Sequence, residues 1–469
     1  MTIMTNALSG ALASQLALSA TSQNIANLQT KGYTRQAALL SAVGADASGK
    51  SVGNGVQVTS LLRFSDGYKS QQMWRAAAET GQYSQTQPYL TQLERVMGDD
   101  TASLSVAVDG FFASLNAVAG DSATSTPLRQ QVLTASGLLA QRFNSLNNVF
   151  NAQQMSVSQQ RSALVDSANA NIGKIAALNA RITQANAVGA PASALIDARD
   201  LAIDELAGMM ALEVSEQPGG VRDISLKTGQ ALVIGNVAGK LKATGGGAGQ
   251  GFELEFASSR YGLDAAKLGG QLGGLTVYER DMLKPMQAVV KQMAEDLSIQ
   301  VNAQLEKGYA MDGSAGKKLF SYNDDGTNIL SVNGLKPTDL AFSADKSEGD
   351  SGNLQILVGI NSKKIVIGRD PLDPSAKPND PLGLGEVMFS DVDAQLVGKL
   401  GVLSQQNQAD LATAQTMRTH AEQDWQSTSG VNQDEEAIKL VEYQNMYQAN
   451  MKVMSVANAL FDATLAMMG

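Results

Sequence analysis

The fold of this chain is decided by residues 429–469, which read SGVNQDEEAIKLVEYQNMYQANMKVMSVANALFDATLAMMG. Apolar residues recur there at heptad spacing, with two more one helical turn away: Leu440, Tyr447, Met454 and Phe461, then Met451 and Leu465. This spacing predicts a helix with a coiled-coil seam. Asn432 can cap the helix, and Glu435 and Glu436 lie in its first turn, where the helix dipole favours negative charge.

The same helix carries a second apolar stripe, formed by Val453, Val456 and Leu460, on the side roughly opposite the seam. A helix that is apolar on two sides must be covered on both, by its own chain, by neighbouring chains or by a membrane. The helix is too short for a membrane span, and polar residues within it, such as Asn450 and Asn458, also argue against one. Two interpretations remain: a buried core helix, or a helix completed only by assembly.

A second helix of the same kind is predicted over residues 3–28. Its large apolar residues share a broad face: Leu8, Leu12, Leu18 and Ile25. The pattern stops at the turn signal Lys31-Gly32-Tyr33, and a short strand is expected around Val56 and Val58. Two such helices at opposite ends of the chain should pair, so that everything between them is looped out.

The composition excludes several classes of function. Asp and Glu outnumber Lys and Arg by 45 to 35, which argues against an extended nucleic-acid interface. The chain has no Cys and a single His, His420, so it cannot form disulfides or thiolate zinc sites, and a His-based catalytic triad is not expected. No apolar run is long enough to span a bilayer. The sequence therefore predicts no enzyme activity, no cofactor and no metal site.

The first residues do not resemble a secretory signal, because their apolar positions are separated by polar ones and the first basic residue is Lys31. This pattern predicts either a cytosolic protein or export by a route that needs no cleaved signal peptide.

The middle of the chain alternates between helical and strand patterns. Residues 61–210 and 277–305 are predicted to be helical, and the period changes to two between 212 and 277. A glycine-rich run at 245–251 lacks the Gly-Lys-Ser/Thr ending of a phosphate loop and is interpreted as a hairpin tip. The motif at 197–200, Asp-Ala-Arg-Asp, is interpreted as a solvated helix face with a local ion pair rather than a carboxylate site.

Residues 312–390 are rich in Gly, Asp and Pro and contain the alternating Ile356, Val358 and Ile360, which predicts strands. Helix is expected again from Val392 towards Trp425. The predicted fold is mainly α with β-rich subdomains, comprising terminal coiled-coil helices, a discontinuous helical-bundle domain and an inserted outer β domain. The expected domains are nested: inner halves at 1–60 and 426–469, a helical core at 61–311 with a hairpin subdomain at 212–277, an outer domain at 312–390, and a return helix at 391–425.

Two motifs at opposite ends of the chain resemble those of a known family. Asn24-Ile25-Ala26-Asn27 followed by Gly32-Tyr33-Thr34-Arg35-Gln36 is similar to the N-terminal signature of bacterial flagellar axial proteins. Its Gly-Tyr-Thr-Arg-Gln continuation resembles the hook-associated family of the hook–filament junction. Near the other end, Gly430, Val431, Asn432, Glu435 and Glu436 also match that family. The resemblance is strong at both ends and weak through most of the middle.

This resemblance implies a structural protein, assembled as a ring between the hook and the filament and required for filament assembly. The implied partners are further copies of the chain, the hook protein on one side, the second junction protein on the other, and an export chaperone on the C-terminal helix. The apolar residues of the two terminal helices would form these interfaces. Export through the flagellar type III channel, without a cleaved signal peptide, is also implied. Another axial protein, such as the second junction protein or the hook protein, or an outer-domain adhesin or hydrolase, remains an alternative.

Overall fold

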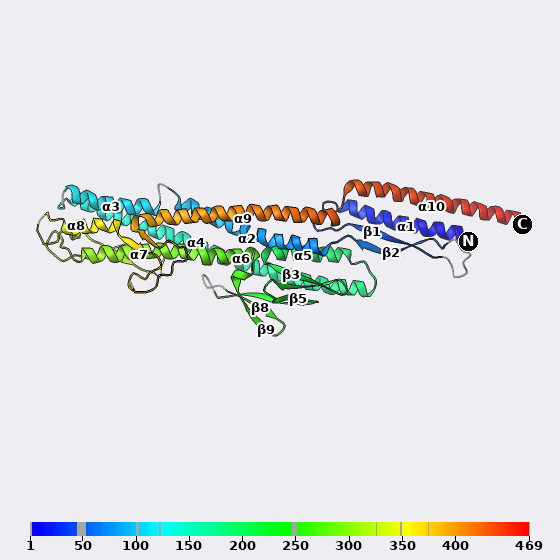
Figure 1. Cartoon of the computed structure of the whole chain (residues 1–469), viewed down its shortest axis with the longest axis horizontal. Helices are drawn as coiled ribbons and strands as arrows, with labels where there is room; N and C mark the ends of the chain where they lie inside the picture. The colour runs from blue at the N-terminus through cyan, green and yellow to red at the C-terminus, as the bar shows by residue number, and fades with distance from the viewer. Residues whose placement is uncertain are drawn as a thin grey trace.

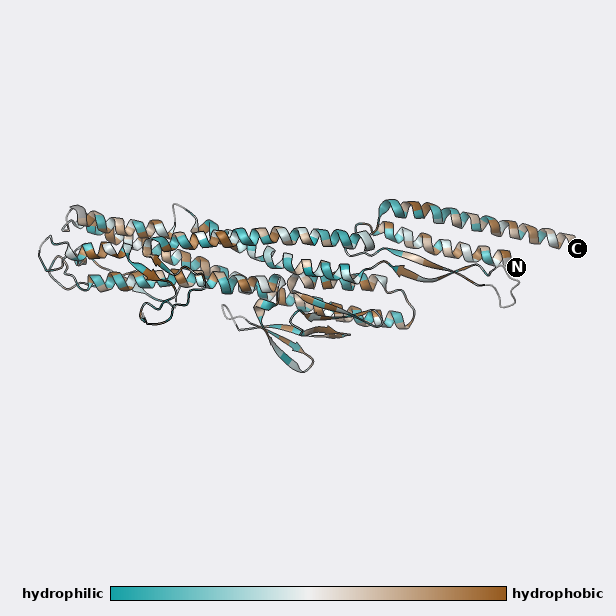
Figure 2. Cartoon of the chain, in the orientation of Figure 1, coloured by the Kyte–Doolittle hydropathy of each residue, from teal (hydrophilic) through white to brown (hydrophobic). Residues whose placement is uncertain are grey.

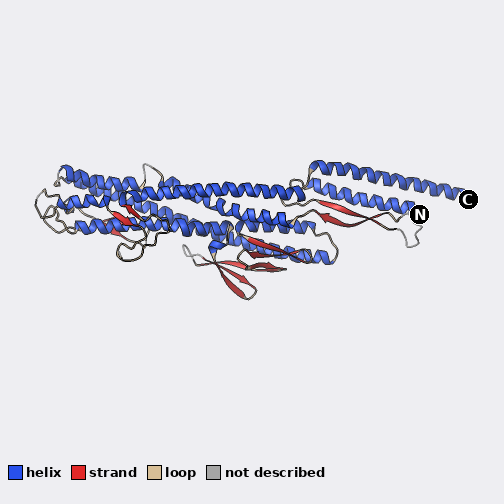
Figure 3. Cartoon of the chain, viewed as in Figure 1, coloured by secondary structure: helices blue, strands red, loops and turns tan. Residues whose placement is uncertain are grey.

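The computed structural model describes residues 2–44, 53–99, 103–121, 123–245, 251–324, 326–347, 349–373 and 375–468. These residues form a long shaft with both termini at one end (Figure 1). Helices make up most of the shaft, and the strands form small sheets along it (Figure 3). The predicted fold class, mainly α with β-rich subdomains, is therefore confirmed. The predicted hairpin tip at residues 246–250 lies outside the described residues.

The helices follow the predicted periodic segments closely. They are α1 (Thr2–Ala26), α2 (Gly67–Met97), α3 (Leu104–Asp121), α4 (Thr126–Ala187), α5 (Ser193–Met209), α6 (Gly270–Tyr278), α7 (Lys284–Leu305), α8 (Gly352–Val358), α9 (Val392–Ser429) and α10 (Gln433–Met468). A short π-helical turn, Glu279–Leu283, joins α6 to α7. The segment predicted as one helix over 277–305 is thus nearly continuous, and it is interrupted only by this π-helical turn.

The strands form five small antiparallel sheets within the described residues. They are β1 (Gln36–Ala42) with β2 (Val56–Arg63); β3 (Leu212–Gln217), β4 (Val221–Leu226), β5 (Ala231–Ile234) and β6 (Val237–Ala238); β7 (Lys240–Thr244), β8 (Gly251–Phe256) and β9 (Ser259–Leu263); β10 (Phe320–Tyr322) with β11 (Leu330–Val332); and β12 (Lys364–Val366) with β13 (Glu386–Met388). The strands predicted between 212 and 277 are confirmed as β3 to β9, which end at Leu263, but the prediction was wrong over residues 270–277, which belong to α6.

The core of the shaft is built around α4, which is 62 residues long and begins with Pro127 in its first turn. Its buried apolar residues recur at helical spacing along the helix and include Val132, Leu139, Phe150 and Val157. They contribute to one hydrophobic core with residues of α2, α3, α5 and α7. A helix this long is stable because neighbouring helices cover its apolar face along much of its length.

The prediction of strands around 356–360 was wrong, because this segment forms α8 and a following 3-10 turn. Leu354 and Leu357 are buried one helical turn apart, whereas Ile356 is 52% exposed. The alternation of apolar residues seen in the sequence therefore does not correspond to the buried face. Strands β10 to β13 of the same region do exist, and their apolar residues share the core with α3, α4 and α7.

The two ends of the chain form a terminal unit, defined here as α1, β1, β2 and α10. Helices α1 and α10 lie side by side, as predicted, and the β1–β2 hairpin packs against α1. A Cβ atom at Gly10 would lie 2.6 Å from the Oδ1 atom of Asn450, so a larger residue there would displace the Asn450 side chain of α10. At the hairpin, Gly55 has a φ of +92° and lies against Ser9 of α1.

Candidate assembly interface at the terminal helices

The two terminal helices pack through small residues and leave large apolar residues outside. The buried face of α1 is formed by Ala7, Ala11, Ser14, Ala17 and Thr21. The large residues predicted to form the interface lie elsewhere on the helix: Leu8 is 46% exposed and Leu12 is 58% exposed, while Leu18 and Ile25 are half-buried. The seam within one molecule therefore does not use the leucines of α1 that the sequence singles out most strongly.

On α10, the residues of the predicted seam divide into two groups. Leu440, Tyr447 and Met454 are half-buried. The remaining residues of the predicted interface are exposed: Met451 by 42%, Leu460 by 59%, Phe461 by 63% and Leu465 by 55%. Figure 1 shows that α10 runs past the N-terminal end of α1, so its last turns have no partner helix in this molecule. Apolar residues persist along α10 to this end in Figure 2.

Asn24 joins both ends of the chain in a buried hydrogen-bond network. Its Oδ1 atom accepts hydrogen bonds from the Tyr33 hydroxyl at 2.9 Å and from the backbone N–H of Gln36 at 3.0 Å. Its Nδ2 atom donates to the carbonyl of Gln36 and to the Glu436 carboxylate, both at 2.8 Å. Asn24 is fully buried and Glu436 is 1% exposed, while Lys439 pairs with the other oxygen of Glu436 at 3.1 Å. The Asn-Ile-Ala-Asn motif thus fixes α10 against the start of β1.

The charge around this network affects Tyr33. Burial raises the pKa of Tyr33, and the nearby carboxylates of Asp197 and Glu436 raise it further. The phenol therefore keeps its proton and remains a hydrogen-bond donor to Asn24.

Arg35 connects the same region to the joint between α9 and α10. Its backbone N–H donates to the carbonyl of Ser429 at 2.8 Å, and its guanidinium pairs with Glu435 at 2.8 Å. The guanidinium also lies 4.4 Å from the centre of the Phe64 ring, within the range of a cation–π contact. The motif residues Arg35 and Glu435, 400 positions apart in the chain, thus meet at this joint.

The remaining motif residues shape the turns. Gly32 has a φ of +80°, which side-chain-bearing residues rarely adopt, and a Cβ atom at Gly430 would lie 2.6 Å from the carbonyl oxygen of Gln426. Asn432 caps α10 as predicted, because its Oδ1 atom accepts from the N–H groups of Asp434 and Glu435. Asn27 makes a local bond to Gln23, and Val431 is half-buried.

The interpretation of residues 197–200 as a solvated helix face was wrong. Asp197 is 8% exposed and Arg199 is 2% exposed. Arg63 of β2 donates from Nε to Asp197 at 2.9 Å and pairs with Asp200 at 3.1 Å, and Arg222 of β4 pairs with Asp200 at 2.7 Å. We call Arg63, Asp197, Arg199, Asp200 and Arg222 the charge cluster. It joins the terminal unit to α5 and β4.

The motif residue Thr34 also belongs to this junction. Its backbone N–H donates to Asp197 at 3.2 Å, and its hydroxyl accepts from Arg63 at 2.9 Å. Burial raises the pKa of Asp197 against the opposing effect of Arg63 and of these hydrogen bonds. Arg63 and Asp197 lie far apart in the sequence, and no local pattern in the chain indicates that they meet.

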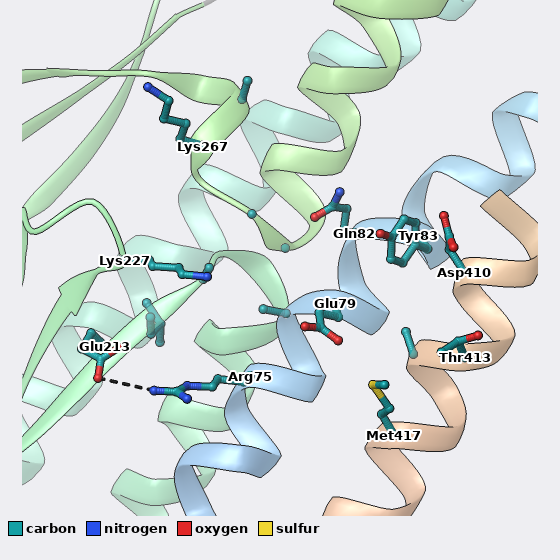
Figure 4. A pocket seen from close by; sticks show the side chains of 17 residues that line it. Arg75, Glu79, Gln82, Tyr83, Glu213, Lys227, Lys267, Asp410, Thr413 and Met417 are labelled. Carbon is teal, nitrogen blue, oxygen red and sulfur yellow. Dashed lines mark ion pairs between the residues drawn. The ribbon is translucent and has the colours of Figure 1, made fainter. Parts of the chain in front are cut away.

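A groove of about 700 Å³ lies between α2, α9 and the β3–β4 hairpin (Figure 4). Its walls carry both signs of charge, and its ion pair between Arg75 and Glu213 is loose, at 3.7 Å, with both side chains more than half exposed. The carboxylates of Asp410 and Glu79 add to burial in raising the pKa of Tyr83. This mixed, open lining does not form an arrangement of nucleophile and base.

Neither a metal site nor a membrane span emerges from the part of the chain that the structure describes. Within the described ranges, no three His, Cys, Asp or Glu residues gather closely enough to hold a metal ion. None of the helices, over the residues that the structure describes, combines the length and apolar character needed to cross a bilayer.

Comparisons with known proteins agree with this architecture. Residues 90–320 match the family described as flagellar hook-associated protein FlgK helical domain, and residues 422–467 match the flagellar basal body rod FlgEFG protein C-terminal family. The chain is 27% identical to flagellar hook-associated protein 1 of Salmonella typhimurium over 99% of both chains, and 24% identical to that of Bacillus subtilis over 97% of this chain and 96% of the relative. A solved structure, the flagellar hook junction protein FlgK from Burkholderia pseudomallei, is similar with a TM-score of 0.50 and 28% identity, over 54% of this chain and 47% of that one.

Proposed function

Because this chain belongs to the FlgK family of flagellar hook-associated proteins, structural components of the hook–filament junction, we propose that its terminal unit forms the contacts between copies in a ring at that junction. The observation that carries this proposal is the division of apolar residues in the terminal unit. Small residues fill the seam within one molecule, while Leu8, Leu12, Met451, Leu460 and Phe461 remain exposed. Clustered exposed apolar residues of this kind are typical of protein interfaces.

The remaining partners follow from the place of such a ring. We propose that one face of the ring contacts the hook protein and the other contacts the second junction protein. Support comes from the extended α10, which is long enough to reach neighbours beyond the end of α1 (Figure 1). The inner domain halves, 1–60 and 426–469, would lie at the centre of the tube, with the core and the 312–390 region outside.

The same apolar surface of α10 creates an aggregation hazard before assembly. We propose that an export chaperone covers α10 in the cytosol through apolar anchors at helical spacing, such as Leu460 and Leu465. The protein is an exported component of the flagellum, and we propose that it leaves through the flagellar type III channel without a cleaved signal peptide. Mass spectrometry of the secreted protein should find residues 2–30 intact, and cleavage within them would contradict this route.

The family is structural, and we propose that this chain has no catalytic activity of its own. In support, the groove in Figure 4 combines exposed charges of both signs rather than a positioned nucleophile.

The double substitution Leu460→Ser and Phe461→Ser tests the interface. Each lost anchor should weaken contacts by about 1–3 kcal/mol, from the apolar area that it no longer buries. We expect weaker chaperone binding in a titration and reduced swimming, with unchanged melting of the core, because both side chains are exposed in the single molecule.

The matched control is Val188→Ser with Leu372→Ser, which removes two exposed apolar residues outside the terminal unit. This control should bind and swim as the wild type does. Wild-type chaperone affinity together with normal swimming in the Leu460→Ser, Phe461→Ser variant would show that this surface is not an interface.

A further inference from the structure

The sequence contains two asparagines that directly precede a glycine, in the pairs Asn54-Gly55 and Asn333-Gly334. Such an asparagine is prone to lose its side-chain amide, because the glycine has no side chain to hinder attack by its backbone nitrogen on the asparagine Cγ atom. In a folded protein, the reaction also requires that the asparagine side chain can turn towards this nitrogen. The structure holds these two asparagines very differently.

Asn333, which follows β11, is half-buried and held by hydrogen bonds. Its Nδ2 atom donates to the carbonyl of Lys318 at 2.9 Å, and its Oδ1 atom accepts from the Ser321 hydroxyl at 2.8 Å. Its backbone N–H also donates to the carbonyl of Leu319 at 2.8 Å. The side chain must break both of its bonds before it can turn towards the next residue, so the fold protects Asn333.

Asn54 lies in the segment that leads into β2, and it is exposed. Within the described residues, its side chain makes one hydrogen bond, from Nδ2 to the carbonyl of Gly44. This bond is 3.5 Å long, which exceeds the usual range. An exposed amide with one long bond can rotate towards the backbone nitrogen of Gly55, and solvent water can reach it.

The same segment is tied closely to α1 in the terminal unit. The backbone N–H of Val56 donates to the hydroxyl oxygen of Ser9 at 3.2 Å, and the Nδ2 atom of Asn6 donates to the carbonyl of Gly53 at 3.4 Å. A Cβ atom at Gly55 would clash with the Oγ atom of Ser9, so no space is left between this segment and the helix. Any lengthening of the main chain here must displace the start of β2 from α1.

We propose that Asn54 is a site of spontaneous deamidation, with water as the co-reactant. The backbone nitrogen of Gly55 loses its proton and bonds to the Cγ atom of Asn54, while the bond from Cγ to Nδ2 breaks and ammonia leaves. The resulting succinimide ring is then opened by water. Cleavage of the ring bond between nitrogen and Cγ gives aspartate, whereas cleavage of the bond between nitrogen and the main-chain carbonyl carbon gives isoaspartate.

The modification changes how the β1–β2 hairpin sits on α1. Both products place a negative charge in the segment before β2, and isoaspartate also makes the main chain one carbon longer. Because this segment has no space against α1, the isoaspartate form must give up the bonds to Ser9 and Asn6. The hairpin is then held more loosely on the helix.

The test follows the tryptic peptides of the purified full chain by mass spectrometry during incubation at pH 8. Isoaspartate is measured separately, from methylation of the chain by an isoaspartyl methyltransferase. We expect the peptide with Asn54 to be converted at least roughly tenfold faster than the peptide with Asn333, because two hydrogen bonds must first break at Asn333. Conversion at Asn54 should be slower at pH 6, because less of the backbone nitrogen is deprotonated.

The variant Asn54→Gln should abolish conversion at this position and leave Asn333 unchanged, because attack on the longer side chain requires a larger ring. In urea, the two wild-type rates should become similar, because the fold no longer holds Asn333. The isoaspartate form, once separated, should show faster hydrogen exchange in residues 56–60 and unchanged exchange in α4. Equal rates at Asn54 and Asn333 in the folded chain, or a difference that persists in urea, would overturn the proposal.

Discussion

At the scale of single residues, Asn24 is the position on which the terminal unit depends most. Asn24→Ala removes four hydrogen bonds and leaves Glu436 buried with Lys439 as its remaining partner. We expect the terminal unit to lose about 2–4 kcal/mol of stability, the usual cost of leaving buried polar groups without partners. Hydrogen exchange in the first turns of α10 should become much faster, while exchange in α4 stays the same.

Asn27→Ala is the matched control, because Asn27 makes only local bonds within its own turn. It should leave exchange in α10 close to that of the wild type. Unchanged exchange in Asn24→Ala would mean that the motif does not hold the two ends together.

A second residue, Asp296 of α7, makes stability depend on pH. Burial raises its pKa from 3.8 to about 6, with a further contribution from Glu295. The folded protein therefore favours the protonated form, and the stability that this form provides is complete below pH 3.8 and is lost as the pH rises through 6. The shift corresponds to at most about 3 kcal/mol, and to about 1 kcal/mol once solvent screening of this partly exposed group is allowed for.

Asp296→Asn mimics the protonated form. At pH 8 it should be more stable than the wild type by about 1 kcal/mol in denaturant unfolding, and the difference should disappear near pH 4. A variant that is less stable at pH 8, or a difference that is independent of pH, would contradict this account.

Residue-level prediction from the sequence succeeded where the relevant contacts are local. Asn432 was recognised as a cap because a cap bonds to the N–H groups two and three residues ahead. The burial of Asp197 and Arg199 was missed because it depends on Arg63, which bonds to Asp197 and Asp200. Arg63 lies more than 130 positions before these two aspartates in the sequence, so no local pattern indicates the contact. The exposure of Leu12 could not be read from periodicity either, since the seam uses the alanines beside it.

At the scale of elements, the charge cluster fixes how β2 and the terminal unit sit on α5. Asp200→Asn removes the charge shared by Arg63 and Arg222, while the polar side chain keeps its size. We expect the angle between the terminal unit and the shaft to become more variable. Because the chain has no Cys, spin labels can be placed at two introduced cysteines, Ala409→Cys on α9 and Gln448→Cys on α10, both exposed. The distribution of distances between these labels should broaden in Asp200→Asn.

Asp324→Asn serves as the control, because it removes an ion pair with Lys291 that lies outside the charge cluster. Its distance distribution should match that of the unsubstituted pair of labels. If the Asp200→Asn distribution is equally narrow, packing rather than charge sets the angle.

Elements were predictable from the sequence where their patterns are long. Helices α4, α9 and α10 were identified because each repeats its pattern over many turns. The short α8 was mistaken for a strand because Ile356, Val358 and Ile360 alternate, whereas the residues that pack into the core, Leu354 and Leu357, have helical spacing.

At the scale of the whole molecule, an isolated chain should behave as a stable shaft with a weakly held terminal unit. The large apolar residues of α1 and α10 contribute little within one molecule, and most of the stability of a protein helix comes from tertiary packing of its apolar face. Limited trypsin digestion of a dilute monomer should remove about residues 1–60 and 426–469 and leave the remainder intact. Termini that resist digestion under these conditions would show that the terminal unit is complete without neighbours.

The central claim, that this chain is a structural part of the hook–filament junction, is tested most directly by electron microscopy of cells from which it has been deleted. The account predicts hooks that carry no filament, with filament protein released into the medium. Restoring the wild-type chain should restore filaments, whereas the Leu460→Ser, Phe461→Ser chain should restore fewer. Deleted cells that still carry filaments of normal length and number would contradict the account.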